Sequence, residues 1–285
     1  MIELRSKANA KLNLTLDVIG KRPDGYHDLC MVMQEIALGD DVTLQMETGE
    51  PWRVISESSE IPCDDSNLAV KAARLFFQAT GIECGGLTVS IQKRTPVCAG
   101  MGGGSADGAA VLRMLDAHYR HPLRHEALYA VAEATGSDVP FALFGGTALA
   151  EEKGQILTRL APMPPCHILL CKPDFPISTP ALFRAIDAET ISARPQTARM
   201  LRALEEGNLQ QIASLLCNVF EPVVAKDHTD IESIRHTMLE RGALGASMTG
   251  SGPTVFGIFE DFSLAESTFS VLKPLYPDTF ITSPV

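Results

Sequence analysis

The chain has 285 residues, of which 45% are hydrophobic and 21% charged, and its formal net charge is -11 at pH 7. This length and composition predict a globular protein with two domains, or one large domain, and an ample buried core. The acidic balance argues against a nucleic acid partner, because binding to a phosphate backbone requires a basic face.

We also expect no membrane partner, since no apolar run approaches the roughly 18 residues that a membrane span requires. The first residues carry charges where a signal peptide would be apolar, which predicts a cytoplasmic protein. The seven cysteines include no CxxC pair, and an odd number cannot form a complete disulfide framework. Reduced and mostly buried thiols are therefore expected.

The first half of the chain mixes strand and helix patterns. Alternating apolar and polar residues predict half-buried strands at residues 12–18, 42–46 and 87–91. Apolar residues at helical spacing predict helices over residues 67–80, 105–118 and 126–135. Ser66 and Gly81 are the expected caps of the first helix, and Gly136 ends the third.

The second half begins with a proline-rich passage around a short apolar strand, residues 167–171. We therefore predict an N-terminal domain of residues 1–158 and a C-terminal domain of residues 159–285. Helices are expected at residues 180–188, 197–205, 208–224, 230–241 and 263–275. Residues 246–259 predict two short strands joined by a glycine turn, and residues 279–283 predict a final strand.

Residues 96–106 read PVCAGMGGGSA and lead directly into a helix pattern. So many glycines cost conformational entropy, which indicates that a ligand must approach the bare backbone closely. A Walker P-loop is excluded, because Gly104 is followed by Ser105 and Ala106 instead of Lys and Ser or Thr. A dinucleotide fingerprint is disfavoured, because Ser105 occupies its third glycine position and the stretch lies far from the first strand.

The remaining interpretation is a loop of exposed N–H groups at a helix N-terminus, which favours an anion such as a phosphate. Ser105 and Asp107 are expected in the first helical turn, with the carboxylate of Asp107 pointing outward, because it would compete with a phosphate. The alternative is a tight loop and helix cap without a ligand. That alternative does not explain three consecutive glycines.

Several separated segments together resemble the GHMP kinases, a family that includes galactokinase, homoserine kinase, mevalonate kinase and phosphomevalonate kinase. The glycine stretch is similar to the phosphate-binding motif of that family, with Met101 in place of the usual leucine. The segments AKLNLTLDVIGKRPDGYHDL, GSDVPFALFGGTA and TGSGPTVFGIF are similar, in the same order, to the branch that serves the non-mevalonate route to isoprenoids.

The resemblance implies an α+β fold with two domains. The N-terminal domain would resemble domain 2 of ribosomal protein S5, and the C-terminal domain would be ferredoxin-like. The implied reaction transfers a phosphoryl group from ATP, with Mg²⁺, to a hydroxyl of a cytidine diphosphate-linked sugar alcohol. The alternative is another small-molecule kinase of the family, of the mevalonate or homoserine type. A monomer or weak homodimer is expected.

The resemblance also implies roles for individual residues. Asp138 matches the catalytic aspartate that takes the proton of the acceptor hydroxyl, and Lys11 matches the lysine that stabilises charge in the transition state. The implied ATP-binding residues are Pro96, Val97, Cys98, Ala99, Gly100, Met101, Gly102, Gly103, Gly104, Ser105, Ala106, Asn67, Leu68 and Lys93. The implied substrate-binding residues are Asn13, Tyr26, His27, Thr179 and Phe183.

A run of histidines at His118, His121 and His125 superficially suggests a metal site. Pro122 interrupts any common helical face, and a solvated helix end is the expected structure. The metal implied by the resemblance is the Mg²⁺ that ATP carries, and its protein ligands are not identified by the sequence.

Overall fold

The structure is a computed structural model, and it describes residues 2–47, 51–188, 191 and 193–285. Its residues form two compact units, each assembled from separate segments of the chain. The first unit comprises Met1–Ala10, Leu38–Val97 and Gly102–Gly145. The second unit comprises Lys11–Ala37, Cys98–Met101 and Gly146–Val285. A domain boundary between residues 158 and 159 stays a prediction, since the units are compact sets of contacts and not continuous sequence domains.

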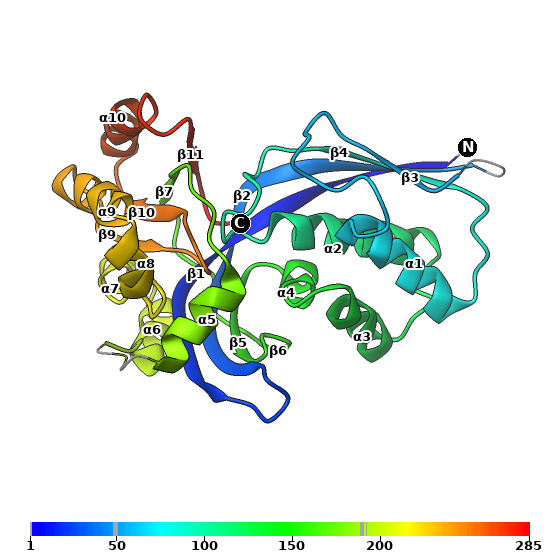
Figure 1. The fold of residues 1–285 in the computed structure, drawn as a ribbon, viewed down its shortest axis with the longest axis horizontal. Coiled ribbons are helices and arrows are strands. Elements are labelled where there is room, and N and C mark those ends of the chain that lie inside the picture. The colour runs from blue at the N-terminus through cyan, green and yellow to red at the C-terminus, as the bar shows by residue number, and fades with distance from the viewer. Residues whose placement is uncertain (1, 48–50, 189–190, 192) are drawn as a thin grey trace. The chain divides into compact units, whose positions relative to one another are not determined.

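Two long strands each contribute residues to both units: β1 (Ile2–Lys21) and β2 (His27–Met46). The sequence pattern found only parts of them. In the first unit, the second half of β2 pairs antiparallel with β4 (Leu87–Gln92), and β4 pairs parallel with β3 (Arg53–Ile55). Helices cover one side of these strands (Figure 1): α1 (Leu68–Thr80), α2 (Gly103–His118), α3 (His125–Thr135) and α4 (Val139–Phe144).

The core of the first unit is apolar and closely follows the helical spacing of the sequence. Phe76 and Phe77 of α1 are buried in one cluster with Leu112 and Leu115 of α2 and Val89 of β4. Each large apolar side chain buried in this way contributes about 1.5–3 kcal/mol to folding. This cluster fixes α2, the helix that follows the glycine stretch, against the strands.

The ends of α1 show one correct and one wrong prediction. Gly81 ends the helix in the left-handed region, with φ of 69°, and its N–H donates to the carbonyl of Phe77. The N-cap is Asn67 and not Ser66. The Asn67 Oδ1 atom accepts a hydrogen bond of 2.9 Å from the N–H of Ala69, whereas the Ser66 hydroxyl donates to the carboxylate of Asp64.

The second unit contains an antiparallel sheet of four strands in the order β11 (Asp278–Thr282), β7 (His167–Lys172), β10 (Val255–Phe259) and β9 (Gly245–Met248). Its helices are α5 (Thr179–Ala188), α6 (Thr197–Glu205), α7 (Leu209–Ser214), α8 (Glu221–Asp227), α9 (Asp230–Glu240) and α10 (Phe262–Leu272). In the same unit, the first half of β2 pairs with β5 (Thr147–Glu152), which pairs with β6 (Ile156–Arg159).

The predicted helix over residues 208–224 is wrong. The segment forms α7, the short strand β8 (Cys217–Asn218) and α8, and β8 pairs in parallel with β1. A continuous helix is disfavoured because Pro222 lacks an N–H donor, whereas proline fits the first turn of a helix, where α8 places it. Asn218 also anchors the segment, since its side-chain amide donates to the carbonyls of Met248 and Gly250 at 2.7 and 2.8 Å.

Candidate functional site

The start of α2 lies beside two of the side chains expected to bind ATP. Helix α2 begins at Gly103, and its N-cap is Gly102 in the left-handed region, with φ of 68°. A Cβ added to Gly103 would lie 3.4 Å from Lys93 Nζ, and one added to Gly104 would lie 3.8 Å from a methyl carbon of Leu68. Within the first unit, the structure therefore brings Leu68 and Lys93 to the glycines.

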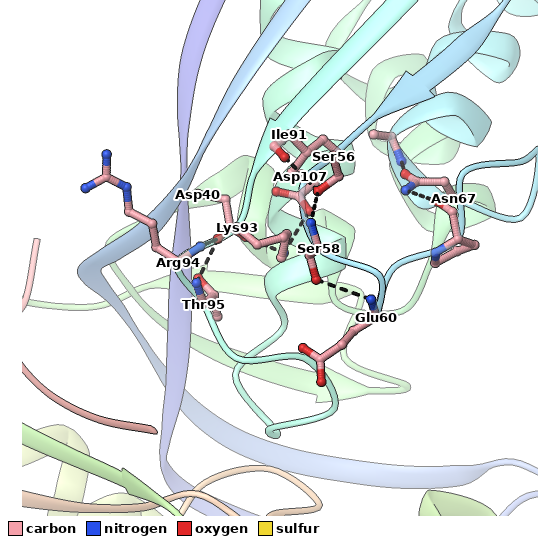
Figure 2. A network of polar contacts seen from close by, with 12 residues as sticks. Asp40, Ser56, Ser58, Glu60, Asn67, Ile91, Lys93, Arg94, Thr95 and Asp107 are labelled. Carbon is pink, nitrogen blue, oxygen red and sulfur yellow. Dashed lines mark hydrogen bonds and ion pairs between the residues drawn. The ribbon is translucent and has the colours of Figure 1, made fainter. Parts of the chain in front are cut away.

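Lys93 is the centre of a buried ionic cluster in the first unit (Figure 2). Its amine forms ion pairs with Asp40 of β2 and with Asp107 of α2, the latter at 3.0 Å. Asp40 is completely buried and also accepts hydrogen bonds of 2.6 and 2.7 Å from the backbone N–H groups of Arg94 and Thr95. Although burial alone lowers the pKa of Lys93, the carboxylates of Asp107 and Asp40 outweigh it and raise this pKa.

The expectation that Asp107 points outward is wrong. Its side chain is buried, because the amine of Lys93 attracts one carboxylate oxygen inward. The other oxygen, Oδ1, has no hydrogen-bond partner among the described residues. Burial raises the pKa of Asp107 to about 7, against the opposing charge of Lys93, so this carboxyl titrates near neutral pH.

The raised pKa of Asp107 predicts that folding stability falls as the pH rises. Because the unfolded state loses this proton near pH 4 and the folded state near pH 7, the folded state binds more protons between those values. We expect the free energy of unfolding of the parent to fall by about 2–3 kcal/mol, relative to an Asp107→Asn variant, from pH 5 to pH 8. Urea titrations of both proteins over this range provide the measurement. Parallel pH profiles would contradict the prediction.

The predicted catalytic lysine belongs to a polar cluster in the second unit. Lys11 Nζ donates to Asn13 Oδ1 at 2.7 Å and to the carbonyl of Gly100 at 3.0 Å. Lys11 is itself 7% exposed. The backbone N–H of Asn13 donates to Thr249 Oγ1 at 3.0 Å. Two predicted site residues and the first half of the glycine stretch therefore meet, together with the TGSG turn.

Thr249 and Asn218 were missed by residue-by-residue reasoning. The TGSG motif pointed to Thr249 only as part of a segment, and nothing in the sequence singles out Asn218. The contact between the two loops is close: a Cβ added to Gly100 would lie 2.3 Å from the carbonyl oxygen of Thr249. Because Gly100 has no side chain, its backbone can pack directly against the backbone of Thr249.

This close approach predicts a large effect for Gly100→Ala. The new Cβ would overlap backbone atoms, and φ of 74° at this position disfavours any side chain. We expect a loss of about 2–5 kcal/mol in the free energy of unfolding. Gly207→Ala is the matched control, because φ is 62° there and no atom lies within 4 Å of the added Cβ. Equal losses in urea titrations would show that the overlap contributes nothing.

The residues expected around the pyrimidine base lie in the second unit. His27, at the start of β2, stacks on Phe183 of α5 with ring centroids 4.6 Å apart. Tyr26 is 64% exposed in the turn before β2, and the amine of Lys153 lies 5.5 Å from its ring centre. Thr179 Oγ1 donates to Ser251 Oγ at 3.1 Å. The structure thus brings His27 and Phe183 into direct contact, and the binding roles of all four predicted residues stay predictions.

Asp138 is the N-cap residue of α4 in the first unit, and its backbone carbonyl accepts from the N–H of Ala142 at 3.0 Å. Its carboxylate makes no capping hydrogen bond. Helix capping therefore does not account for the aspartate side chain. The predicted catalytic role stays a prediction.

The histidine run has structural contacts. His121 pairs with Asp116 at 2.7 Å, and His125 stacks on Tyr129. Across residues 2–47, 51–188, 191 and 193–285, no group of three acidic, histidine or cysteine side chains is placed to hold a metal ion. All seven cysteines are free thiols, but only Cys166 and Cys171 are buried, so the expectation of mostly buried thiols is wrong. Cys98 in the glycine stretch is exposed.

Comparisons with known proteins identify the family of the chain. Residues 67–146 match the family model of the GHMP kinases N terminal domain, and residues 200–277 match that of the GHMP kinases C terminal domain. The glycine stretch and Asp138 lie in the first match, and the TGSG turn lies in the second. The chain therefore belongs to the GHMP kinases.

Individual relatives indicate which branch of the GHMP kinases the chain belongs to. The chain is 43% identical over 258 residues to the 4-diphosphocytidyl-2-C-methyl-D-erythritol kinase of Pelotomaculum thermopropionicum, covering 90% of each chain. It is 38% identical to the enzyme of the same name from Alkaliphilus metalliredigens, covering 99% of this chain and 96% of that one. A crystal structure of 4-(cytidine 5'-diphospho)-2C-methyl-D-erythritol kinase is similar with a TM-score of 0.84, 30% identity and 99% coverage of both chains. The chain belongs to this kinase family.

A more distant neighbour shows the fold alone. Homoserine kinase from Cytophaga hutchinsonii superposes with a TM-score of 0.75 at 16% identity, over 99% of this chain and 94% of that one. The two-domain α+β fold predicted from the sequence is thereby confirmed. Among the described residues, no helix is long and apolar enough to cross a membrane.

Proposed function

We propose that the protein transfers the γ-phosphoryl group of ATP to the 2-hydroxyl of 4-diphosphocytidyl-2-C-methyl-D-erythritol. The products are the 2-phosphate and ADP, in the non-mevalonate route to isoprenoid precursors. The contact of Lys11 with both Asn13 and the Gly100 carbonyl carries this proposal. It joins the predicted catalytic lysine to a predicted substrate residue and to the glycine stretch.

In the proposed mechanism, the chain supplies positioning and electrostatic stabilisation. The backbone amides at the start of α2 receive the ATP phosphates, because the N-terminus of a helix favours an anion. Asp138 accepts the proton of the attacking hydroxyl as the oxygen forms its bond to the γ-phosphorus. The ammonium group of Lys11 stabilises the negative charge that develops during transfer.

Mg²⁺ is part of the proposal. Proteins usually hold this ion through one or two carboxylates, substrate phosphates and water, so a dedicated cage of protein ligands is not required. The donors at the start of α2 fit a nucleotide whose phosphates carry the ion. When bound, Mg²⁺ would neutralise part of the charge on those phosphates.

The alternative is a GHMP kinase of the mevalonate or homoserine type. The stacked pair of His27 and Phe183 favours the cytidylated substrate, because an aromatic surface suits a nucleotide base and mevalonate and homoserine carry none. We further propose a cytoplasmic monomer or weak homodimer with a small-molecule substrate and no nucleic acid partner. The seven free thiols fit a reducing compartment.

One assay tests the proposal. ADP release is measured from ATP with the cytidylated alcohol, with mevalonate and with homoserine, in the presence of Mg²⁺. Turnover with the cytidylated alcohol alone is the expected result. Turnover with mevalonate or homoserine instead would favour the alternative, and tight ATP binding with no turnover would favour a regulatory protein on the same fold.

A further inference from the structure

Two residues of one helix hold the imidazole of His27. Phe183 stacks on its face at an angle of 19°, and Asp187 Oδ1 lies 2.7 Å from Nε2 at its edge. Phe183 and Asp187 are four residues apart in α5, so one helical face presents both groups. The side chain of His27 is only 7% exposed, and these contacts fix both the plane and the rotation of the ring.

Both carboxylate oxygens of Asp187 have partners. Oδ2 accepts a hydrogen bond of 2.7 Å from Lys21 Nζ at the end of β1, while Oδ1 faces His27. Hydrogen bonds from Lys21 and His27 lower the pKa of Asp187, so the group is ionised near neutral pH. An ionised carboxylate only accepts hydrogen bonds, and His27 Nε2 therefore carries the proton between them. In the neutral imidazole, Nδ1 is then an acceptor.

A pocket of about 320 Å³ adjoins this pair within the second unit. His27, Lys21 and Asp187 line it together with apolar side chains, including Val18 and Ile186. The imidazole of His27 thus lies beside a concave surface that is lined by both charged and apolar side chains. Ligand sites commonly combine apolar side chains with a few polar groups.

We propose that Asp187 is a positioning residue, which fixes the tautomer and orientation of His27 and so selects cytosine over uracil. The inference rests on the proposed function, which gives His27 a pyrimidine base as its partner. Cytosine carries an amine donor at the ring position where uracil carries an oxygen acceptor. The acceptor Nδ1 of His27 pairs with the amine and repels the oxygen. Sites that hydrogen-bond one group reject an analogue that leaves a buried polar atom unpaired.

The decisive variant is Asp187→Asn, which keeps the size of the side chain. Its amide can donate to Nε2 and so permits the opposite tautomer of His27. Calorimetry with CDP, UDP and ATP gives the affinities without requiring turnover. We expect the variant to bind CDP about tenfold more weakly, with its preference for CDP over UDP reduced by a similar factor. Its affinity for ATP is expected to stay within about twofold of the parent.

Glu205→Gln is the matched control, because it removes one negative charge from an exposed carboxylate at the end of α6. This control is expected to keep the parent affinity for both pyrimidine nucleotides. An Asp187→Asn protein that binds CDP as tightly as the parent overturns the inference. In steady-state assays, the KM for the cytidylated alcohol is expected to rise about tenfold while kcat stays within about threefold.

A second measurement does not depend on a folded variant. Proton–nitrogen correlation spectra of the parent are expected to show His27 protonated at Nε2 and bare at Nδ1. The opposite tautomer overturns the inference while leaving the proposed reaction intact. A parent that binds CDP no more tightly than UDP contradicts the assignment of the cytidylated substrate itself, and with it this inference.

Discussion

Replacing Asp138 with asparagine is expected to lower kcat about 100- to 10,000-fold, with little change in the KM for ATP. Asparagine cannot accept the proton of the acceptor hydroxyl, and a general base contributes a factor of this size. The loss corresponds to roughly 3–5 kcal/mol in the barrier. Coupled assays of ADP release at saturating ATP provide the measurement.

The structure makes this substitution favourable for testing. Asp138 begins α4, and asparagine is as good an N-cap residue as aspartate, so the helix is expected to form normally. Asp261→Asn is the matched control, since Asp261 is the N-cap of α10 and its side chain does accept a capping hydrogen bond, from Ser263. We expect the control to keep parent activity. Near-full turnover by Asp138→Asn would remove Asp138 from the catalytic assignment.

The sequence predicted those parts of the fold that local patterns determine. Long periodic helices such as α1 and α2 were found within two residues of their ends, because their apolar spacing and their flanking glycines are local signals. The strands β3, β5 and β6 were missed, although β4 and β7, of similar length, were found, because no clear alternation of apolar and polar residues marks them. Strand β5 pairs with β2, far away in the chain, and β3 pairs with β4 across the helix α1, while among the described residues β6 pairs only with β5.

In the candidate site too, the features with a local sequence signal were predicted and those formed by distant residues were not. The glycine stretch was recognisable from the sequence alone. So many glycines cost conformational entropy on folding, which indicates that a ligand or another backbone segment approaches them closely. The cluster of Lys93 with Asp40 and Asp107 was not recognisable from the sequence, because Asp40 precedes Lys93 by 53 residues and no local pattern links them. Asp107 was expected to point outward because its carboxylate would compete with a phosphate, and that reasoning did not include Lys93, which attracts the carboxylate inward. Asp187, 160 residues from His27, had no sequence signal.

Replacing Lys93 with methionine is expected to lower the free energy of unfolding by about 3–5 kcal/mol at pH 8. Methionine keeps the apolar stem but leaves Asp40 and Asp107 buried without their shared cation, and an uncompensated buried charge is strongly destabilising. The loss is expected to be smaller at pH 5.5, because Asp107, whose pKa is about 7 in the parent and rises further without Lys93, then carries a proton and only Asp40 needs a partner. Urea titrations at the two pH values provide the measurement.

The neighbouring residue offers a matched control for this prediction. Arg94 also pairs with a carboxylate, Asp41, but both side chains are about half exposed, so the ion pair is screened by water. Arg94→Met removes one positive charge from the same loop and is expected to cost at most about 1 kcal/mol. Asp107→Asn in the Lys93→Met background is expected to restore part of the lost stability, since it removes one of the two unpaired carboxylates. If Lys93→Met costs no more than Arg94→Met, or if the second substitution restores nothing, the buried cluster does not stabilise the loop before α2.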